Sequence, residues 1–191
     1  MIKYPNGQNN NTQKRINNKA NQGMDFENML NESNKYYLSK QIANIHKKPT
    51  PVTIVKVDYP MRSKARIVEA YYQTPSTTDY NGIYKGFHID FEAKETIQNS
   101  FSFSHIYEHQ VKHLESIRNL GGIAFVIIYY KTHNKIFIID INDFKKLYYD
   151  KTKKSIKVND CENIGILVST GYTPVVDYLK AVDQIILNKL Q

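Results

Sequence analysis

The sequence predicts a single α/β domain in which a mixed β-sheet is flanked by helices. Three observations support this fold class. Apolar stripes at helical spacing follow residues 25 and 173, a β-hairpin signal spans residues 79–94, and the continuous apolar run 123–130 is typical of a central strand buried on both faces. The 191 residues are enough to bury a substantial core.

The composition favours a polyanionic partner. The formal net charge is +8 and the isoelectric point is near 9.3, a balance that suits nucleic acid or, alternatively, an anionic membrane surface. The single cysteine, Cys161, excludes an intramolecular disulfide and a cysteine-based zinc site. Because the sequence has no signal-peptide pattern and no apolar run of the roughly 20 residues that span a bilayer, we expect a cytoplasmic protein with no membrane partner.

The first 22 residues are rich in Asn, Gln and Lys and poor in apolar positions, which predicts a flexible basic arm. Lys14 and Arg15 in this arm are candidate DNA contacts, and a solvated tail is the alternative. From residue 23 onward we expect one domain, residues 23–191. Asp25 is positioned to cap a helix whose apolar stripe would run from Phe26 to Ile45.

Residues 52–59 alternate in polarity and predict a strand that Pro60 ends. The next segment, residues 61–76, carries basic residues followed by tyrosines, a pattern that suits contact with nucleic acid. The candidate DNA contacts here are Arg62, Lys64, Arg66 and Tyr72. A surface helix with satisfied charges explains the same pattern equally well.

The most informative stretch is residues 77–94, TTDYNGIYKGFHIDFEAK. Asp79 opens the first strand-like run, Lys85-Gly86 is a turn signal, and the second run begins at Phe87. Alternate side chains of a strand share a face. One face of the second run therefore carries His88, Asp90, Glu92 and Lys94, and the other face is apolar.

Carboxylates beside a lysine on one strand face suit a Mg²⁺ site, because Mg²⁺ prefers hard oxygen ligands and keeps waters and substrate phosphates around it. Lys94, one pleat from Glu92, would orient an attacking water or stabilise negative charge in the transition state. Asp79 followed by Glu92-Ala93-Lys94 has the form of the PD-(D/E)xK nuclease motif. The pattern also arises by chance in charged proteins, so a solvated polar strand face is the alternative.

Beyond the hairpin, the expected elements are a helix over 104–119 capped by Gly121-Gly122, strands over 123–130 and 135–141, a helix over 142–149, a surface loop over 151–157, a strand over 164–169 and a final helix started by Thr173-Pro174.

The segment from His105 to His109 spells H-x-x-E-H, the inverted zincin pattern. No third zinc ligand is evident, so we favour histidines that face solvent or phosphate, His113 included.

Six segments of the chain match one known pattern: MIKYPNG, RINNKANQGMDFENMLNESNKYYL, IANIHKKPTPVTIVKVDYP, STTDYNGIYKGFHIDFEAKET, EHQ at residues 108–110, and STGYTPVVDYL. Together they give a chain that resembles the RecU-type Holliday junction resolvases over nearly its whole length. The resemblance implies a restriction-endonuclease-like fold. It also implies a Mg²⁺-dependent, dimeric endonuclease that cuts DNA four-way junctions in recombination and repair, and it raises a RecA-type recombinase as a further partner.

The resemblance also assigns roles to residues. Mg²⁺ would be held by Asp79 and Glu92, with Thr77 and Gln110 completing the shell directly or through water, and Lys94 would assist catalysis. Asp90 and Glu27 are expected to support the site from beside the ligands. Residues 61–76 would project as a stalk that enters the junction, and the N-terminal arm would add to junction binding. A junction-binding accessory protein with no cleavage activity is the alternative function.

Overall fold

The computed structural model describes residues 25–61, 64–72 and 77–190. The helices are α1 (Phe26–Ser39), α2 (Glu108–Asn119), α3 (Ile141–Tyr148), α4 (Val158–Ile164) and α5 (Tyr178–Leu190), with short 3₁₀ turns at Phe103–His105 and Lys131–His133. The strands are β1 (Ala43–Lys47), β2 (Val52–Asp58), β3 (Arg66–Tyr72), β4 (Tyr80–Tyr84), β5 (Phe87–Thr96), β6 (Ser100–Ser102), β7 (Ile123–Tyr130), β8 (Lys135–Asp140), β9 (Ser155–Lys157) and β10 (Ile166–Val168).

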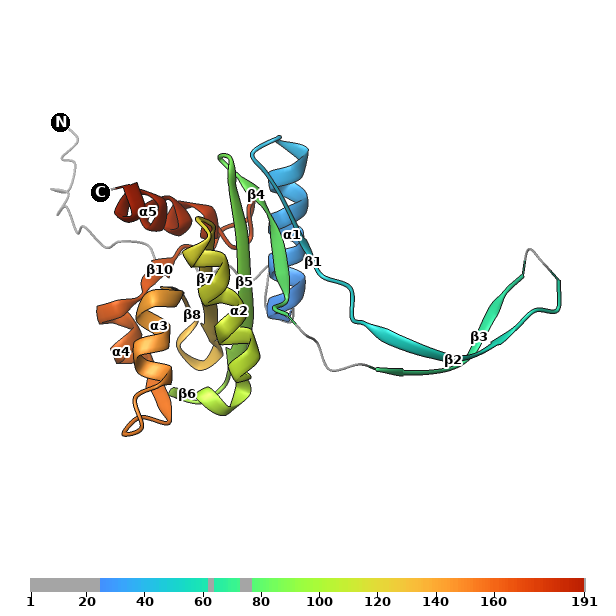
Figure 1. The fold of residues 1–191 in the computed structure, drawn as a ribbon. Coiled ribbons are helices and arrows are strands. Elements are labelled where there is room, and N and C mark those ends of the chain that lie inside the picture. Colours follow the sequence, from blue (N-terminus) through green and yellow to red (C-terminus); the bar gives the residue numbers. More distant parts are fainter. Residues whose placement is uncertain (1–24, 62–63, 73–76, 191) are drawn as a thin grey trace, which may run out of the picture.

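A six-stranded mixed sheet forms the body of the molecule, with strand order β1-β4-β5-β7-β8-β10 (Figure 1). β5 and β7 run parallel in the middle of the sheet, and the other neighbouring pairs are antiparallel. β5 and β7 are parallel because α2 makes the crossover between them. The predicted mixed sheet flanked by helices is confirmed, and in the described residues no helix is long and apolar enough to cross a membrane.

Helices cover both faces of the sheet, and each face has its own apolar core. α1 and α5 pack on one face, over side chains such as Ile89, Phe91 and Ile127. α2, α3 and α4 pack on the other face, over side chains such as Val126, Ile128 and Ile139. Because alternate residues of the central strands point into opposite cores, β7 reads as a continuous apolar run.

Stacked aromatic rings support the central strands from the α1 side. The ring of Phe91 in β5 stacks on Tyr80 at 4.9 Å between centroids and on Phe125 at 4.8 Å, with interplanar angles of 4° and 10°. All three rings are almost completely buried. Such aromatic contacts contribute stability beyond their buried area, so this part of β5 is held by tight packing on one face.

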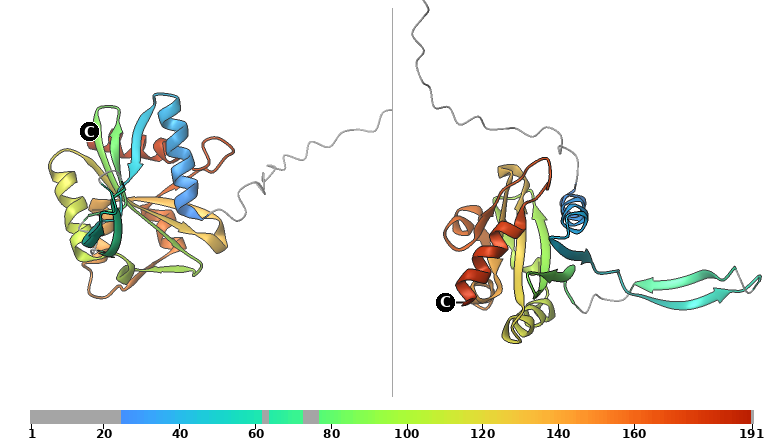
Figure 2. Two further views of the ribbon diagram at one scale, coloured as in Figure 1. Left: turned by 90° about the vertical axis from the view of Figure 1, so that its right-hand side faces the viewer. Right: turned by 90° about the horizontal axis from the view of Figure 1, so that it is seen from above.

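β2 and β3 pair antiparallel in a separate two-stranded ribbon that projects from the body (Figures 1 and 2). The surface-helix alternative for residues 61–75 is wrong, because residues 66–72 form a strand. The projection also includes β2, so it starts earlier than the expected segment 61–76. Its apolar side chains, including Val55, Ile67 and Tyr71, are exposed on the ribbon.

Several expected boundaries are wrong, although Asp25 caps α1 through its bond from the Asn28 N–H at 2.8 Å. The first helix ends at Ser39, because Gln41 adopts a left-handed conformation (φ 56°) and Ile42 and Ile45 belong to the turn and to β1. α2 begins at Glu108 rather than Ser104, and the last helix begins at Tyr178 rather than Pro174. β9 lies at the end of the expected loop 151–157, and α4 follows it in a stretch for which no element was expected.

Candidate active site

The predicted hairpin is confirmed, and its two strands differ in length. Lys85 and Gly86 form the turn with φ of 49° and 80°, the positive values of a tight two-residue hairpin turn. β4 ends its pairing with β5 at Tyr80 opposite Phe91, whereas β5 continues to Thr96 alongside β7. The edge of β5 that faces β4 is therefore open from Glu92 onward.

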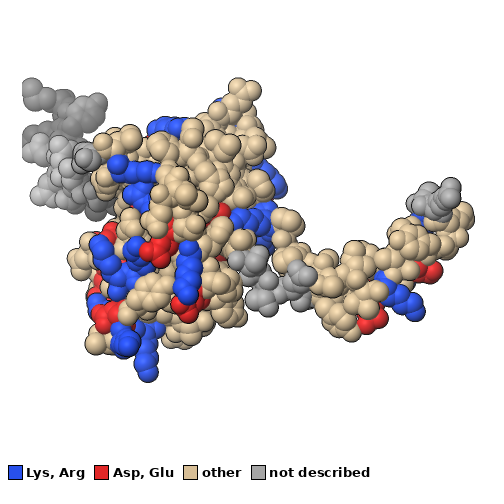
Figure 3. Space-filling model, viewed as in Figure 1, with Lys and Arg blue, Asp and Glu red and all other residues tan. Residues whose placement is uncertain are grey.

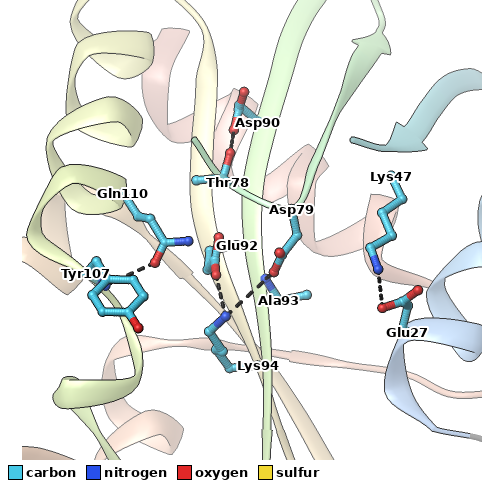
Figure 4. A network of polar contacts seen from close by, with 10 residues as sticks. All are labelled: Glu27, Lys47, Thr78, Asp79, Asp90, Glu92, Ala93, Lys94, Tyr107 and Gln110. Carbon is cyan, nitrogen blue, oxygen red and sulfur yellow. Dashed lines mark hydrogen bonds and ion pairs between the residues drawn. The ribbon is translucent and has the colours of Figure 1, made fainter. Parts of the chain in front are cut away.

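Asp79 occupies this open edge. Its carboxylate Oδ2 accepts a hydrogen bond from the backbone N–H of Ala93 at 3.1 Å, which satisfies a strand donor that β4 no longer reaches. The same oxygen lies 3.8 Å from Lys94 Nζ. The sequence-predicted trio of Asp79, Glu92 and Lys94 is thus brought together by the end of β4 (Figure 4).

Glu92 is fully buried on the α2 face of β5. The pKa of its carboxyl is raised from 4.5 to about 7, chiefly by burial and then by the charge of Asp79, while the ammonium of Lys94 opposes the shift. Oε1 accepts a hydrogen bond from Lys94 Nζ, and no donor in the described part of the chain pairs with Oε2. An orphaned buried carboxylate oxygen carries a desolvation cost that a bound cation would offset.

Lys94 stays charged at this site. Burial lowers the pKa of its ammonium, but the charges of Glu92 and Asp79 outweigh burial, so the pKa is raised above its usual value. The ammonium therefore joins the two carboxylates (Figure 4). When both carboxylates are ionised, the site carries one more negative than positive charge, which makes it attractive to a cation.

A cleft of about 680 Å³ opens at this end of the sheet. It is lined by residues from the start of α1, from β1, from the β4–β5 hairpin and from the segment before α2: Asp25, Phe26, Glu27, Lys47, Asp79, Tyr80, Ala93, Lys94, Glu95, Ser104, His105 and Tyr107. The cleft is large enough for a phosphodiester and its neighbouring sugars, and Asp79 and Lys94 both reach it.

The donor set fits Mg²⁺. Two carboxylates, one of them with an unpaired buried oxygen, suit an ion that completes its shell with waters and phosphate oxygens. In residues 25–61, 64–72 and 77–190, no three His, Cys, Asp or Glu side chains gather as a metal cluster. The zincin interpretation is therefore wrong, since His105 lies in a 3₁₀ turn, outside the α-helix that holds His109.

Gln110 and Thr77 have different surroundings from each other. Gln110 is buried in the first turn of α2, and its Oε1 accepts the backbone N–H of Tyr107 at 3.0 Å, as the N3 residue of a capping box does. Figure 4 shows its amide on the α2 side of Glu92. Thr77 is half-buried at the start of the segment that leads into β4.

Asp90 and Glu27 take different positions. Glu27 lines the cleft and pairs with Lys47, which also lines it (Figure 4). Asp90 is 1% exposed, and its polar and charged partners do not include Glu92. They are Thr78 Oγ1, Lys48 Nζ at 2.8 Å, His113 Nε2 at 3.2 Å and His88 Nε2 at 3.6 Å. Lys48 and Thr78 were not predicted from the sequence. Lys48 belongs to the segment IHKKPTP, where the ribbon leaves the body.

The predicted DNA contacts are only partly within the described residues. Lys64 and Arg66 are exposed on the ribbon, and the backbone of Tyr72 ends β3. Arg62, Lys14 and Arg15, and with them the proposed basic arm 1–22, lie outside the described residues. Figure 3 shows Lys and Arg side chains spread over the visible face of the body, together with a few on the ribbon.

Comparisons with known proteins show which family the chain belongs to. The family model described as Recombination protein U matches residues 21–184. The Holliday junction resolvase RecU of Staphylococcus aureus strain JH9 is 48% identical over 171 residues, which cover 87% of this chain and 82% of that relative, and the protein of the same name from strain MRSA252 gives the same values.

A solved structure is also similar in part. The structure of Archaeoglobus fulgidus Hjc, a Holliday junction resolvase, aligns with a TM-score of 0.41 at 12% identity and covers 68% of this chain and 85% of that one. The family match extends over most of the chain and includes the hairpin, the cleft and the ribbon. This chain is therefore a member of the Recombination protein U family.

Proposed function

We propose that this protein is a Mg²⁺-dependent endonuclease that resolves DNA four-way junctions by paired, symmetric nicks in recombination and repair. One observation carries the proposal: Asp79, Glu92 and Lys94 meet at the open edge of β5, and Asp79 and Lys94 line a cleft that can admit a phosphodiester. Membership of a family whose relatives are named Holliday junction resolvases supports junction DNA as the substrate.

Asp79 and Glu92 would hold the ion, with Thr77 and Gln110 completing its surroundings. When bound, Mg²⁺ supplies positive charge that polarises the phosphate and favours ionisation of a nearby water. A water attacks the phosphorus opposite the O3′ leaving group, the P–O3′ bond breaks, and the leaving oxygen takes up a proton. The products are a 5′-phosphate and a 3′-hydroxyl.

Lys94 acts on the same phosphate. Its ammonium is held by Glu92 and Asp79 while it faces the cleft, so it is preorganised to stabilise the extra negative charge of the transition state or to orient the attacking water. Because a carboxylate on each side keeps it protonated, it serves as an electrostatic stabiliser rather than as a base.

Surfaces outside the cleft would distinguish the four-way junction from linear duplex. The projecting ribbon offers Lys64, Arg66 and exposed apolar side chains that suit insertion between DNA arms. Two symmetric cuts need two active sites, so the proposed working form is a two-fold homodimer. A RecA-type recombinase is a further proposed partner, and the cytoplasm is the proposed location.

The deciding experiment compares a synthetic four-way junction with a linear duplex of the same arms, with Mg²⁺ or EDTA, for the wild-type protein and Lys94→Ala. We expect paired nicks that require Mg²⁺, occur on the junction and disappear in Lys94→Ala while binding persists. Tight junction binding with no nicks from the wild-type protein would instead support an accessory protein. Equal action on junction and duplex would overturn the proposed substrate.

A further inference from the structure

The ribbon is joined to the body by two connectors, residues 48–51 before β2 and residues 77–79 before β4, and each connector is bound close to the sheet. In the first, the backbone N–H of Lys48 donates to the Asp79 carbonyl at 2.8 Å, and its Nζ donates to Thr78 Oγ1 at 2.9 Å. The two connectors are therefore tied directly to each other at the ribbon's base.

Asp90 holds both connectors from within the sheet. Its carboxylate accepts the Thr78 hydroxyl and the Lys48 ammonium, the latter at 2.8 Å, and His113 of α2 approaches at 3.2 Å. The side chain is 2% exposed, and that of Lys48 is 18% exposed, so this ion pair is screened by solvent far less than a surface pair. A buried, multiply hydrogen-bonded pair of this kind fixes geometry strongly.

Asp90 also lies on the catalytic strand. It precedes Glu92 by two residues on the same face of β5, which places their Cα atoms roughly 7 Å apart along the strand. The residue that binds both connectors and the predicted metal ligand are thus parts of one strand in the centre of the sheet.

We propose that Asp90, together with Lys48 and Thr78, is a positioning group that fixes the orientation of the β2–β3 ribbon relative to the catalytic cleft. Its role differs from the support of the metal shell expected from the sequence, since its partners belong to the connectors and α2. The structural part of the proposal stands on these contacts alone, and its consequence for junction binding rests on the proposed function.

The test measures ribbon orientation directly, with spin labels on Lys56→Cys in the ribbon and Lys146→Cys on α3, both exposed positions. Cys161 is fully buried, so the labels react at the introduced thiols, which labelling of the parent protein checks. Distance distributions are compared for the parent, Asp90→Asn and Thr78→Val. The matched control is Asp183→Asn, because Asp183 also binds a lysine, Lys85, and a hydroxyl, that of Tyr84, at the other end of β4.

We expect a narrow distribution in the parent and in Asp183→Asn, and broader ones in Asp90→Asn and Thr78→Val. The Kd for a four-way junction should rise by roughly 3- to 10-fold in Asp90→Asn and Thr78→Val, because binding must then select one ribbon orientation from a larger set of orientations. The kcat at saturating junction should stay unchanged, a split that general destabilisation would not give.

Unchanged distributions in both anchor variants, or a broad distribution in the parent, would overturn the proposal. If Asp90→Asn fails to fold, Thr78→Val decides alone, because valine keeps the shape of threonine and leaves the Lys48–Asp90 pair in place. If the distributions broaden as expected but the parent neither binds nor cuts junctions, the anchor stands and the proposed function fails.

Discussion

The carboxylate of Asp79 accepts the backbone N–H of Ala93 at 3.1 Å, and Ala93 is the residue between Glu92 and Lys94. A single hydrogen bond therefore sets the first acidic residue against the strand that carries the other two groups. The bond exists because β4 stops at Tyr80 and leaves the β5 edge unpaired.

Replacing Lys94 by Met should lower the rate of junction cleavage by about 10²- to 10³-fold, because it removes the charge that faces the phosphate. Junction binding should persist, since Lys94 is one of 26 basic residues and lies within the cleft. Single-turnover cleavage and gel-shift titration measure the two effects. Lys85→Met, at the hairpin turn outside the cleft, is the control, and a loss as large in this variant would contradict the assignment.

Replacing Glu92 by Gln should abolish most cleavage without destabilising the metal-free protein. Glutamine keeps the shape of the side chain and removes a buried charge whose Oε2 has no described partner, so the free energy of unfolding in EDTA should stay within about 1 kcal/mol of wild type or rise. Urea unfolding measures this. Glu115→Gln, on α2 outside the cleft and paired with Lys145, is the comparison and should keep its activity.

The stability of the metal-free protein should depend on Glu92 between pH 4.5 and about 7. The pKa of its carboxyl is 4.5 when unfolded and about 7 when folded, so in this window the folded state binds more protons. Its stabilising contribution is full below pH 4.5 and is lost as the pH rises through about 7, by roughly 1–3 kcal/mol.

The measurement is the difference in unfolding free energy between wild type and Glu92→Gln, in EDTA at several pH values. This difference isolates Glu92 from other titrating groups. A difference that does not change with pH across the window would show that the buried carboxyl keeps its ordinary pKa.

Two substitutions of Gln110 should separate its cap from its role at the metal. Gln110→Ala removes the acceptor for the Tyr107 N–H and should cost about 1 kcal/mol of stability. Gln110→Glu keeps an acceptor at the same position and should restore stability, because glutamate also serves at N3 of a capping box. If both variants cleave junctions as wild type does, Gln110 is a cap alone.

Replacing residues 52–72 by a short Gly/Ser linker should leave the body folded and remove junction selectivity. The ribbon forms its own two-stranded sheet, and those of its apolar side chains that the structure describes lie outside the two buried cores. The melting temperature should stay close to wild type, whereas junction affinity should approach that for linear duplex. Thermal unfolding and competition gel shifts test the two parts, and retention of full junction preference would rule out the ribbon as its source.

The sequence predicted the hairpin and the meeting of Asp79, Glu92 and Lys94 because both depend on local signals. A Lys-Gly turn and strict alternation determine which side chains share a face. The predicted end of the first helix was wrong because the spacing of Tyr37, Ile42 and Ile45 also fits a helix. The left-handed conformation of Gln41, which ends the helix, is not indicated by its residue type.

The contacts of Asp90 could not be predicted from alternation alone. Apart from His88, its partners come from residues 12 to 42 positions away in the chain, so only the three-dimensional packing of both connectors and α2 brings them together. The capping bond of Gln110 could not be predicted either, because it depends on the residue at which α2 begins.

The stacked rings of Tyr80, Phe91 and Phe125 have a consequence for mutational screens. Phe91 lies between Asp90 and Glu92 in the chain, yet its side chain points into the opposite layer of the molecule. A substitution that shifts this ring by a fraction of an ångström would move both carboxylates while leaving each of them chemically intact. Inactive variants selected in vivo should therefore cluster at these three aromatic positions as densely as at the acidic ones.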